Sequence, residues 1–60
     1  MRAREMEKIL LDGGWYFVKQ VGSHRQFKHN EKPGKVTLPI HTGDIDKRTA
    51  DSILKQAGFK

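Results

Sequence analysis

The sequence contains no cysteine among its 60 residues, and acidic residues are scarce, with 7 Asp and Glu against 12 Lys and Arg. The lack of cysteine excludes disulfide bonds and a cysteine-ligated zinc site as supports for the fold. Apolar residues make up only 35% of the chain and form no long run, which argues against a transmembrane helix and a signal peptide. So short a chain buries only about 60% of the surface that it exposes when unfolded. We therefore expect one cytoplasmic domain over residues 1–60 and exclude a two-domain enzyme.

The positive charge is concentrated in the middle of the chain. The net charge is +5, and residues 15–41 hold five Lys or Arg against one Glu, together with His24, His29 and His41. A local positive field attracts polyanions and makes their binding salt-dependent, which points first to nucleic acid and second to an acidic protein. The alternative is a solvated, lysine-rich surface with no partner.

The hydrophobic spacing predicts two helices around three strands. Met6 and Leu10 recur at helical spacing until Gly13 ends the first helix, and Asp46 caps a second helix that Gly58 ends. Between them, strand-forming residues predict three strands, over 15–20, 24–29 and 35–40. The fold class is therefore α+β in the order α-β-β-β-α, with a three-stranded antiparallel sheet and both helices on one face. The other face stays open to solvent.

The register of the first hairpin has two solutions. If the loop is the pair 22–23, Val18 faces Phe27, whereas in a three-residue loop over 21–23 it is Phe17 that faces Phe27. A slip by one residue turns the whole first strand over. The second strand does not depend on this choice.

The strand over residues 24–29 carries the side chains that are suited to catalysis and ligand binding. Side chains alternate between the two faces of a strand, and Phe27 belongs in the core, so His24, Gln26 and Lys28 project from the open face. A histidine titrates near neutral pH, a lysine binds phosphate, and a glutamine hydrogen-bonds a sugar or a base. The alternative is that an exposed histidine beside a turn has no function.

Two other kinds of site do not fit this sequence. His24 and His29 point to opposite faces of one strand and the nearest carboxylate is Glu31, so no metal site forms. Ser23 precedes His24, but neighbouring strand residues face opposite ways and no acid orients the imidazole, which argues against a serine hydrolase. Metal-free RNA cleavage remains, because the substrate supplies the nucleophilic 2′-hydroxyl and the protein needs only a proton-transfer group and cations.

The surrounding residues have less defined roles. Further candidates for phosphate contacts are Lys19, Arg25, Lys32 and Lys35, although Arg25 lies on the core face unless it is at the rim of the sheet. At least two of the three successive aromatics Trp15, Tyr16 and Phe17 belong in the core, which leaves one for base stacking. We expect His29 to be partly buried and hydrogen-bonded near the turn, and we assign no role to His41.

Several short motifs together carry a family resemblance. They are Gly22-Ser23-His24 with Phe27 and His29, then Leu38-Pro39 with His41, and the closing Ile53-Leu54-Lys55-Gln56-Ala57-Gly58. With these, the chain resembles the HicA family of toxin–antitoxin mRNA interferases. The resemblance implies a double-stranded-RNA-binding-domain-like fold and a type II toxin that cleaves mRNA without metal or ribosome and so inhibits translation.

The resemblance also implies residue roles and partners. His24 falls on the family's catalytic histidine, and Gly22 shapes the turn that presents it. The expected partners are RNA and a HicB-type antitoxin that covers this histidine, with no cofactor, metal or membrane. The predicted RNA-binding residues are Gly22, Ser23, Arg25, Gln26, Lys28 and Lys19. The alternatives are a non-catalytic RNA-binding module of the same fold and a domain that docks an acidic protein.

Overall fold

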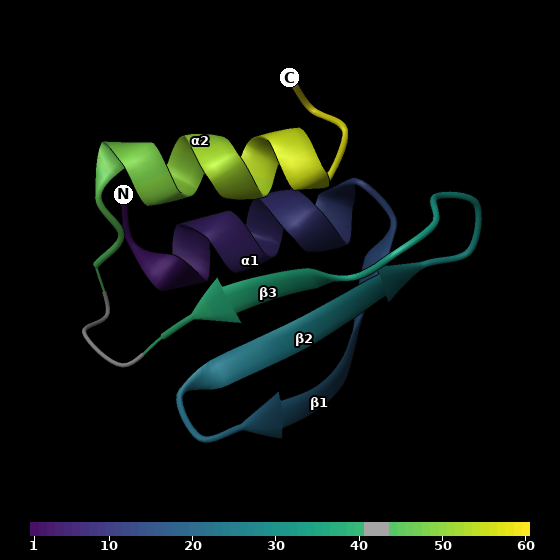
Figure 1. Cartoon of the computed structure of the whole chain (residues 1–60), viewed down its shortest axis with the longest axis horizontal. Helices are drawn as coiled ribbons and strands as arrows, with labels where there is room; N and C mark the ends of the chain where they lie inside the picture. Colours follow the sequence, from purple (N-terminus) through teal and green to yellow (C-terminus); the bar gives the residue numbers. More distant parts are fainter. Residues whose placement is uncertain (41–43) are drawn as a thin grey trace.

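The computed structural model describes residues 1–40 and 44–60 and contains five elements, in the predicted order. They are α1 (Ala3–Asp12), β1 (Trp15–Val21), β2 (His24–His29), β3 (Val36–Pro39) and α2 (Lys47–Gln56). The strands form one antiparallel sheet in the order β1-β2-β3, so β2 is the central strand. Both helices pack against the same face of this sheet (Figure 1). The α+β class and the element order predicted from the sequence are confirmed.

Polar contacts at the first turn fix where each helix starts. At α1 the backbone amide of Arg2 donates to the Glu5 carboxylate at 2.9 Å. At α2 the Asp46 carboxylate accepts from the Thr49 amide at 2.8 Å, which satisfies a donor that the helix itself leaves unpaired. Hydrogen bonds from the Thr49 side chain and from its amide lower the pKa of Asp46 below its usual range. The predicted cap is therefore confirmed.

The core lies between the helices and the inner face of the sheet. Phe27 and Val36 are completely buried at its centre, and the Trp15 indole Nε1 donates to the Ala57 carbonyl oxygen at 3.3 Å. The buried apolar residues are Ala3, Met6, Leu10, Trp15, Phe27, Val36, Leu38, Ile45, Ala50, Ile53 and Ala57. These residues come from all five elements and from the segment before α2, so one core holds the helices and the sheet together.

The β1–β2 hairpin combines the two predicted solutions. Val21 pairs with His24, so the loop is the pair 22–23, yet Phe17 still pairs with Phe27. A β-bulge between Phe17 and Lys19 accounts for both facts, because one extra residue in β1 restores the register that the short loop would shift. The first solution was therefore right about the loop and wrong about the register, and the second solution was wrong about the loop and right about the register.

No helix in the described part of the chain is long and apolar enough to span a membrane.

Candidate functional site

The open face of the sheet consists of three rows of side chains that run across the strands. Partners in an antiparallel pair project from the same face, so the strand register defines each row. The first row is Val21, His24 and Pro39, and the second is Lys19, Gln26 and Thr37. The third row is Tyr16 and Lys28, with Lys35 next to them because it precedes the Val36 that pairs with Phe27. Neighbouring rows are about 7 Å apart along the strands.

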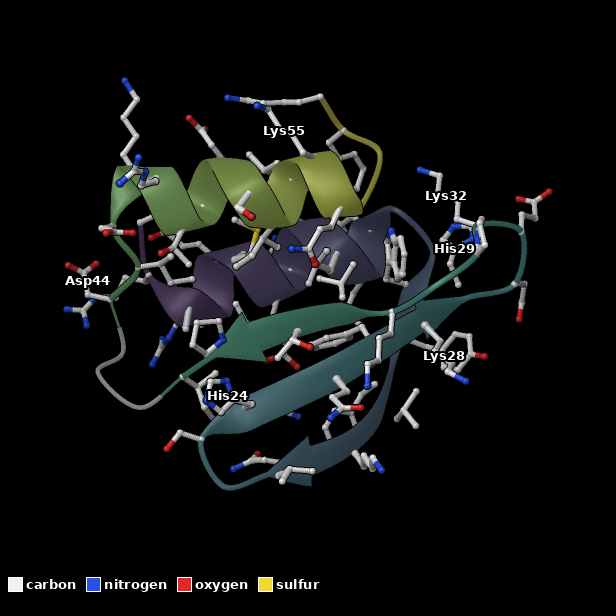
Figure 2. All side chains as sticks on the ribbon, in the orientation of Figure 1. His24, Lys28, His29, Lys32, Asp44 and Lys55 are labelled. Atoms are coloured by element: carbon white, nitrogen blue, oxygen red, sulfur yellow. The ribbon has the colours of Figure 1, made fainter. Side chains whose placement is uncertain are left out.

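His24 projects from this open face and is exposed to solvent. It is the first residue of β2, directly after the turn, and it lies at the opposite end of the strand from Lys28 (Figure 2). Its ring is therefore on the side of the sheet away from the helices, as the alternation around Phe27 predicted.

Hydrogen bonds to both of its carbonyl groups hold the turn that presents His24. The Ile40 amide donates to the Ser23 carbonyl at 2.8 Å, and the Gln20 side-chain amide donates to the Gly22 carbonyl at 2.9 Å. Gly22 has a φ of +58°, whereas Ser23 has a negative φ, as in a type II′ turn. A Cβ at position 22 would meet no atom of the described residues within 4 Å, and the positive φ is what requires the glycine.

The charge of the open face is positive. The three strands contain no aspartate or glutamate. Lys19 and Lys28 project from this face and are exposed, as is Lys35 beside β3. The face therefore carries cations around His24 and no carboxylate from its own strands, which favours an anionic ligand.

Arg25 belongs to the other face. Its guanidinium Nη1 lies 3.4 Å from the Glu7 carboxylate of α1, and its charged carbon lies 4.5 Å above the Phe17 ring. Its Nε is buried and has no hydrogen-bond partner within residues 1–40 and 44–60. The sheet thus separates Arg25 from His24, and the RNA-binding role that the sequence predicted for Arg25 stays a prediction.

His29 also lies on the inner face and supports the fold. Its Nδ1 accepts hydrogen bonds from the amides of Glu31 at 3.0 Å and Lys32 at 3.2 Å, which makes Nε2 the protonated nitrogen, 3.0 Å from the Gly13 carbonyl. The ring packs edge-on against Trp15 with centroids 5.2 Å apart. The predicted partial burial and hydrogen bonding near the turn are confirmed. His41 lies outside the described residues.

The structure brings together most of the predicted RNA-binding residues. Lys19, Gln26 and Lys28 share the open face with His24, and Gly22 and Ser23 form the turn beside it. The expectation that at least two of the three successive aromatics lie in the core was wrong, because only Trp15 is buried. Phe17 is on the inner face but 43% exposed at the edge strand, and Tyr16, at 45% exposure, is the one on the open face. Across residues 1–40 and 44–60, no group of three or more His, Asp or Glu is placed to hold a metal ion.

Comparisons with known proteins agree with this fold. The family model described as the HicA toxin of bacterial toxin–antitoxin matches residues 3–59. A solved chain from a toxin–antitoxin complex of Streptococcus pneumoniae is 32% identical, with a TM-score of 0.84 and coverage of 97% of each chain. No curated protein matches. The match over nearly the whole chain shows that this protein belongs to the HicA toxin family of bacterial toxin–antitoxin systems.

Proposed function

We propose that this toxin is an endoribonuclease that cleaves mRNA without metal or ribosome and so inhibits translation in the cytoplasm. The observation that carries the proposal is an exposed imidazole on a cationic sheet face whose strands contribute no carboxylate. Membership of the HicA family supports the same conclusion. The toxin domain corresponds to residues 1–60.

Cleavage of RNA by its own 2′-hydroxyl requires only a proton-transfer group and cations from the protein. The 2′-hydroxyl oxygen of one ribose attacks the adjacent phosphorus, a 2′-O–P bond forms, and the P–O5′ bond breaks. The products are a 2′,3′-cyclic phosphate and a 5′-hydroxyl. His24 transfers one proton, either from the attacking hydroxyl or to the leaving oxygen, and water transfers the other. Nearby cations stabilise the negative charge that develops on the phosphorane oxygens.

The residues of the first two rows have separate roles in this proposal. Lys19 places a cation one row away from His24, and Gln26 offers an amide to a base or a sugar. The turn formed by Gly22 and Ser23 fixes the position of the imidazole and directs backbone groups toward the substrate. Lys28 contributes phosphate binding at the far end of β2.

The same open face is the proposed binding surface for a HicB-type antitoxin. The similar solved chain comes from a toxin–antitoxin complex, which supports an antitoxin partner for this toxin. An antitoxin over the first row would exclude RNA from His24. Adding such an antitoxin in equimolar amount is expected to stop cleavage.

The test uses purified protein, a single-stranded RNA and the DNA of the same sequence, with EDTA present throughout. The proposal predicts cleavage of the RNA alone, with cyclic 2′,3′-phosphate ends, and no cleavage by an identically purified His24→Ala variant. Lys8→Gln, a change of an exposed lysine on α1, is the matched control and should cleave as wild type does. Product ends with a 5′-phosphate would refute the mechanism. RNA binding without cleavage would instead identify a non-catalytic RNA-binding module.

A further inference from the structure

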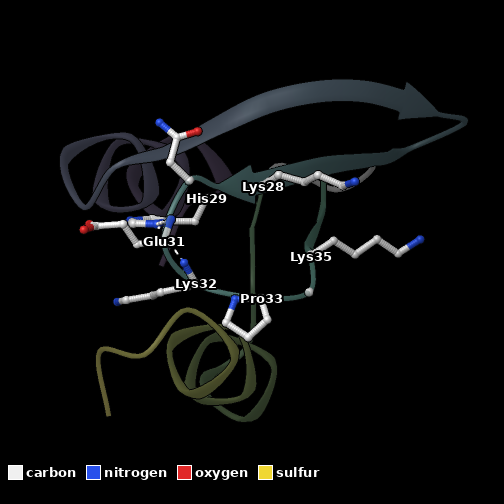
Figure 3. Close-up of a pocket in the computed structure, with 8 residues that line it drawn as sticks. Lys28, His29, Glu31, Lys32, Pro33 and Lys35 are labelled. Atoms are coloured by element: carbon white, nitrogen blue, oxygen red, sulfur yellow. Dashed lines mark hydrogen bonds between the residues drawn. The ribbon is translucent and has the colours of Figure 1, made fainter.

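Two lysines lie side by side in the third row of the open face. Lys28 in β2 and Lys35 before β3 line the same open cavity of about 560 Å³ at the β2–β3 loop. Figure 3 shows their side chains extending in the same direction, whereas Glu31 and Lys32, which also line the cavity, extend toward the opposite side. The two ammonium groups therefore face the same volume of solvent.

This pairing of like charges has no compensation within the described part of the chain. No hydrogen bond or ion pair there engages the side-chain ammonium group of Lys28 or Lys35. Lys32 differs, because its ammonium donates to the Ala57 carbonyl at 2.9 Å and lies 5.4 Å from the centre of the Phe59 ring. Like charges on neighbouring strands are destabilising, and an anion held between the two lysines would remove that repulsion.

An aromatic ring completes the row. Tyr16 is the β1 partner of Lys28 and is 45% exposed on the same face. Of its two aromatic neighbours, Trp15 is buried in the core, and Phe17, although 43% exposed, lies on the inner face with the Arg25 guanidinium over its ring. A base can stack on an exposed tyrosine only when it is unpaired.

We propose that the third row is a nucleotide subsite for single-stranded RNA, in which Lys28 and Lys35 bind a phosphate and Tyr16 stacks on a base. The inference rests on the proposed function and specifies its substrate class. The row is about 13 Å from His24 along β2, because Lys28 is four positions further along the strand. The subsite therefore holds a nucleotide away from the cleaved bond, and it contributes to substrate binding rather than to proton transfer.

The first test measures binding without cleavage. The probe is a 2′-O-methyl single-stranded RNA, which has no free 2′-hydroxyl, and its affinity is measured by fluorescence anisotropy over a range of salt concentrations. Each phosphate contact with a single strand contributes about 0.7 to the slope of log K against log salt. The double variant Lys28→Gln/Lys35→Gln should lower the slope by at least that amount, and Lys8→Gln should leave it unchanged. An unchanged slope in the double variant would overturn the phosphate assignment.

The second test concerns stacking and strandedness. Tyr16→Phe should retain the affinity of the single-stranded probe, and Tyr16→Leu should weaken it about tenfold, because only the ring stacks. A duplex of the same probe should show no difference between these two variants. Equal loss on the duplex, or equal affinity of both variants for the single strand, would overturn the role of Tyr16.

The third test separates this inference from the proposed function. With cleavable RNA, Lys28→Gln/Lys35→Gln should raise KM and leave kcat within about twofold, and a dinucleotide that is too short to reach the third row should be cleaved equally by wild type and variant. If wild type binds RNA with the lysine-dependent slope but never cleaves it, the enzyme proposal fails and the subsite stands. If RNA is cleaved normally and only antitoxin binding is weakened in the variant, the subsite is refuted and the lysines are a protein contact.

Discussion

His29 provides the sharpest test of how the fold holds the β2–β3 loop. Its ring joins this loop to the end of α1 through three hydrogen bonds, two at Nδ1 and one at Nε2. Each hydrogen bond contributes about 0.5–1.5 kcal/mol net, and water can replace part of the bonding at half-exposed groups, so His29→Ala should cost about 2 kcal/mol. In a domain of this size that loss lowers Tm by about 8–16 °C. Circular dichroism at 222 nm during heating and during urea unfolding measures it.

Two partial replacements separate the two sides of the ring. Asparagine places its oxygen near the position of Nδ1, and glutamine places its amide nitrogen near that of Nε2, so His29→Asn keeps the loop contacts and His29→Gln keeps the contact to Gly13. Each should recover about half of the stability lost in His29→Ala, and the folded fraction of all three variants should cleave RNA at the wild-type kcat. If the free energy of unfolding of His29→Ala lies within 0.5 kcal/mol of that of wild type, or if the folded variant does not cleave RNA, the structural role of His29 is refuted.

Three further predictions test the turn, the bulge and the helix cap. Gly22→Ala should cost about 1–2 kcal/mol, because its φ of +58° strains an L-residue, and should lower kcat, whereas D-alanine introduced by chemical synthesis should restore both. Deleting Val18 should leave every pair of the hairpin aligned, so Phe17–Phe27 contacts should persist in NMR spectra; their loss would refute the bulge. Asp46 contributes stability above pH 3.8, the usual value for its carboxyl, and this contribution disappears as the pH falls through its lowered folded-state pKa. Asp46→Ala should therefore destabilise the protein at pH 7 more than at pH 2, and an equal effect at both would contradict the cap.

Hydrophobic spacing was sufficient to predict the elements and the face of His24. The buried positions of α1 recur at helical spacing, Asp46 caps α2, and Phe27 alone determines which side of β2 faces the core. These features depend on residues that are close together in the chain, so the spacing of hydrophobic residues predicts them. The open face and its positive charge follow from the same alternation.

The bulge and the partners of Arg25 and His29 depend on tertiary contacts, which the sequence alone does not indicate. Val18 lies in a run of strand-forming residues that is compatible with two registers, so the sequence did not indicate the bulge and could not identify Tyr16 as the aromatic on the open face. Strand alternation placed Arg25 on the core face, but its partners there, Glu7 of α1 and the Phe17 ring, could not be predicted because they depend on how the helix packs on the sheet. The partners of His29 are backbone amides and a carbonyl, which every residue type supplies.

The most direct measurement of the central claim is rescue of His24→Ala by added imidazole. The His24 ring is exposed, so its removal leaves a space that free imidazole in solution can reach. If His24 transfers the proton, the variant does not cleave RNA by itself, and cleavage in EDTA returns in proportion to the imidazole concentration. A variant that cleaves RNA at the wild-type rate without imidazole would contradict the proposed role of His24.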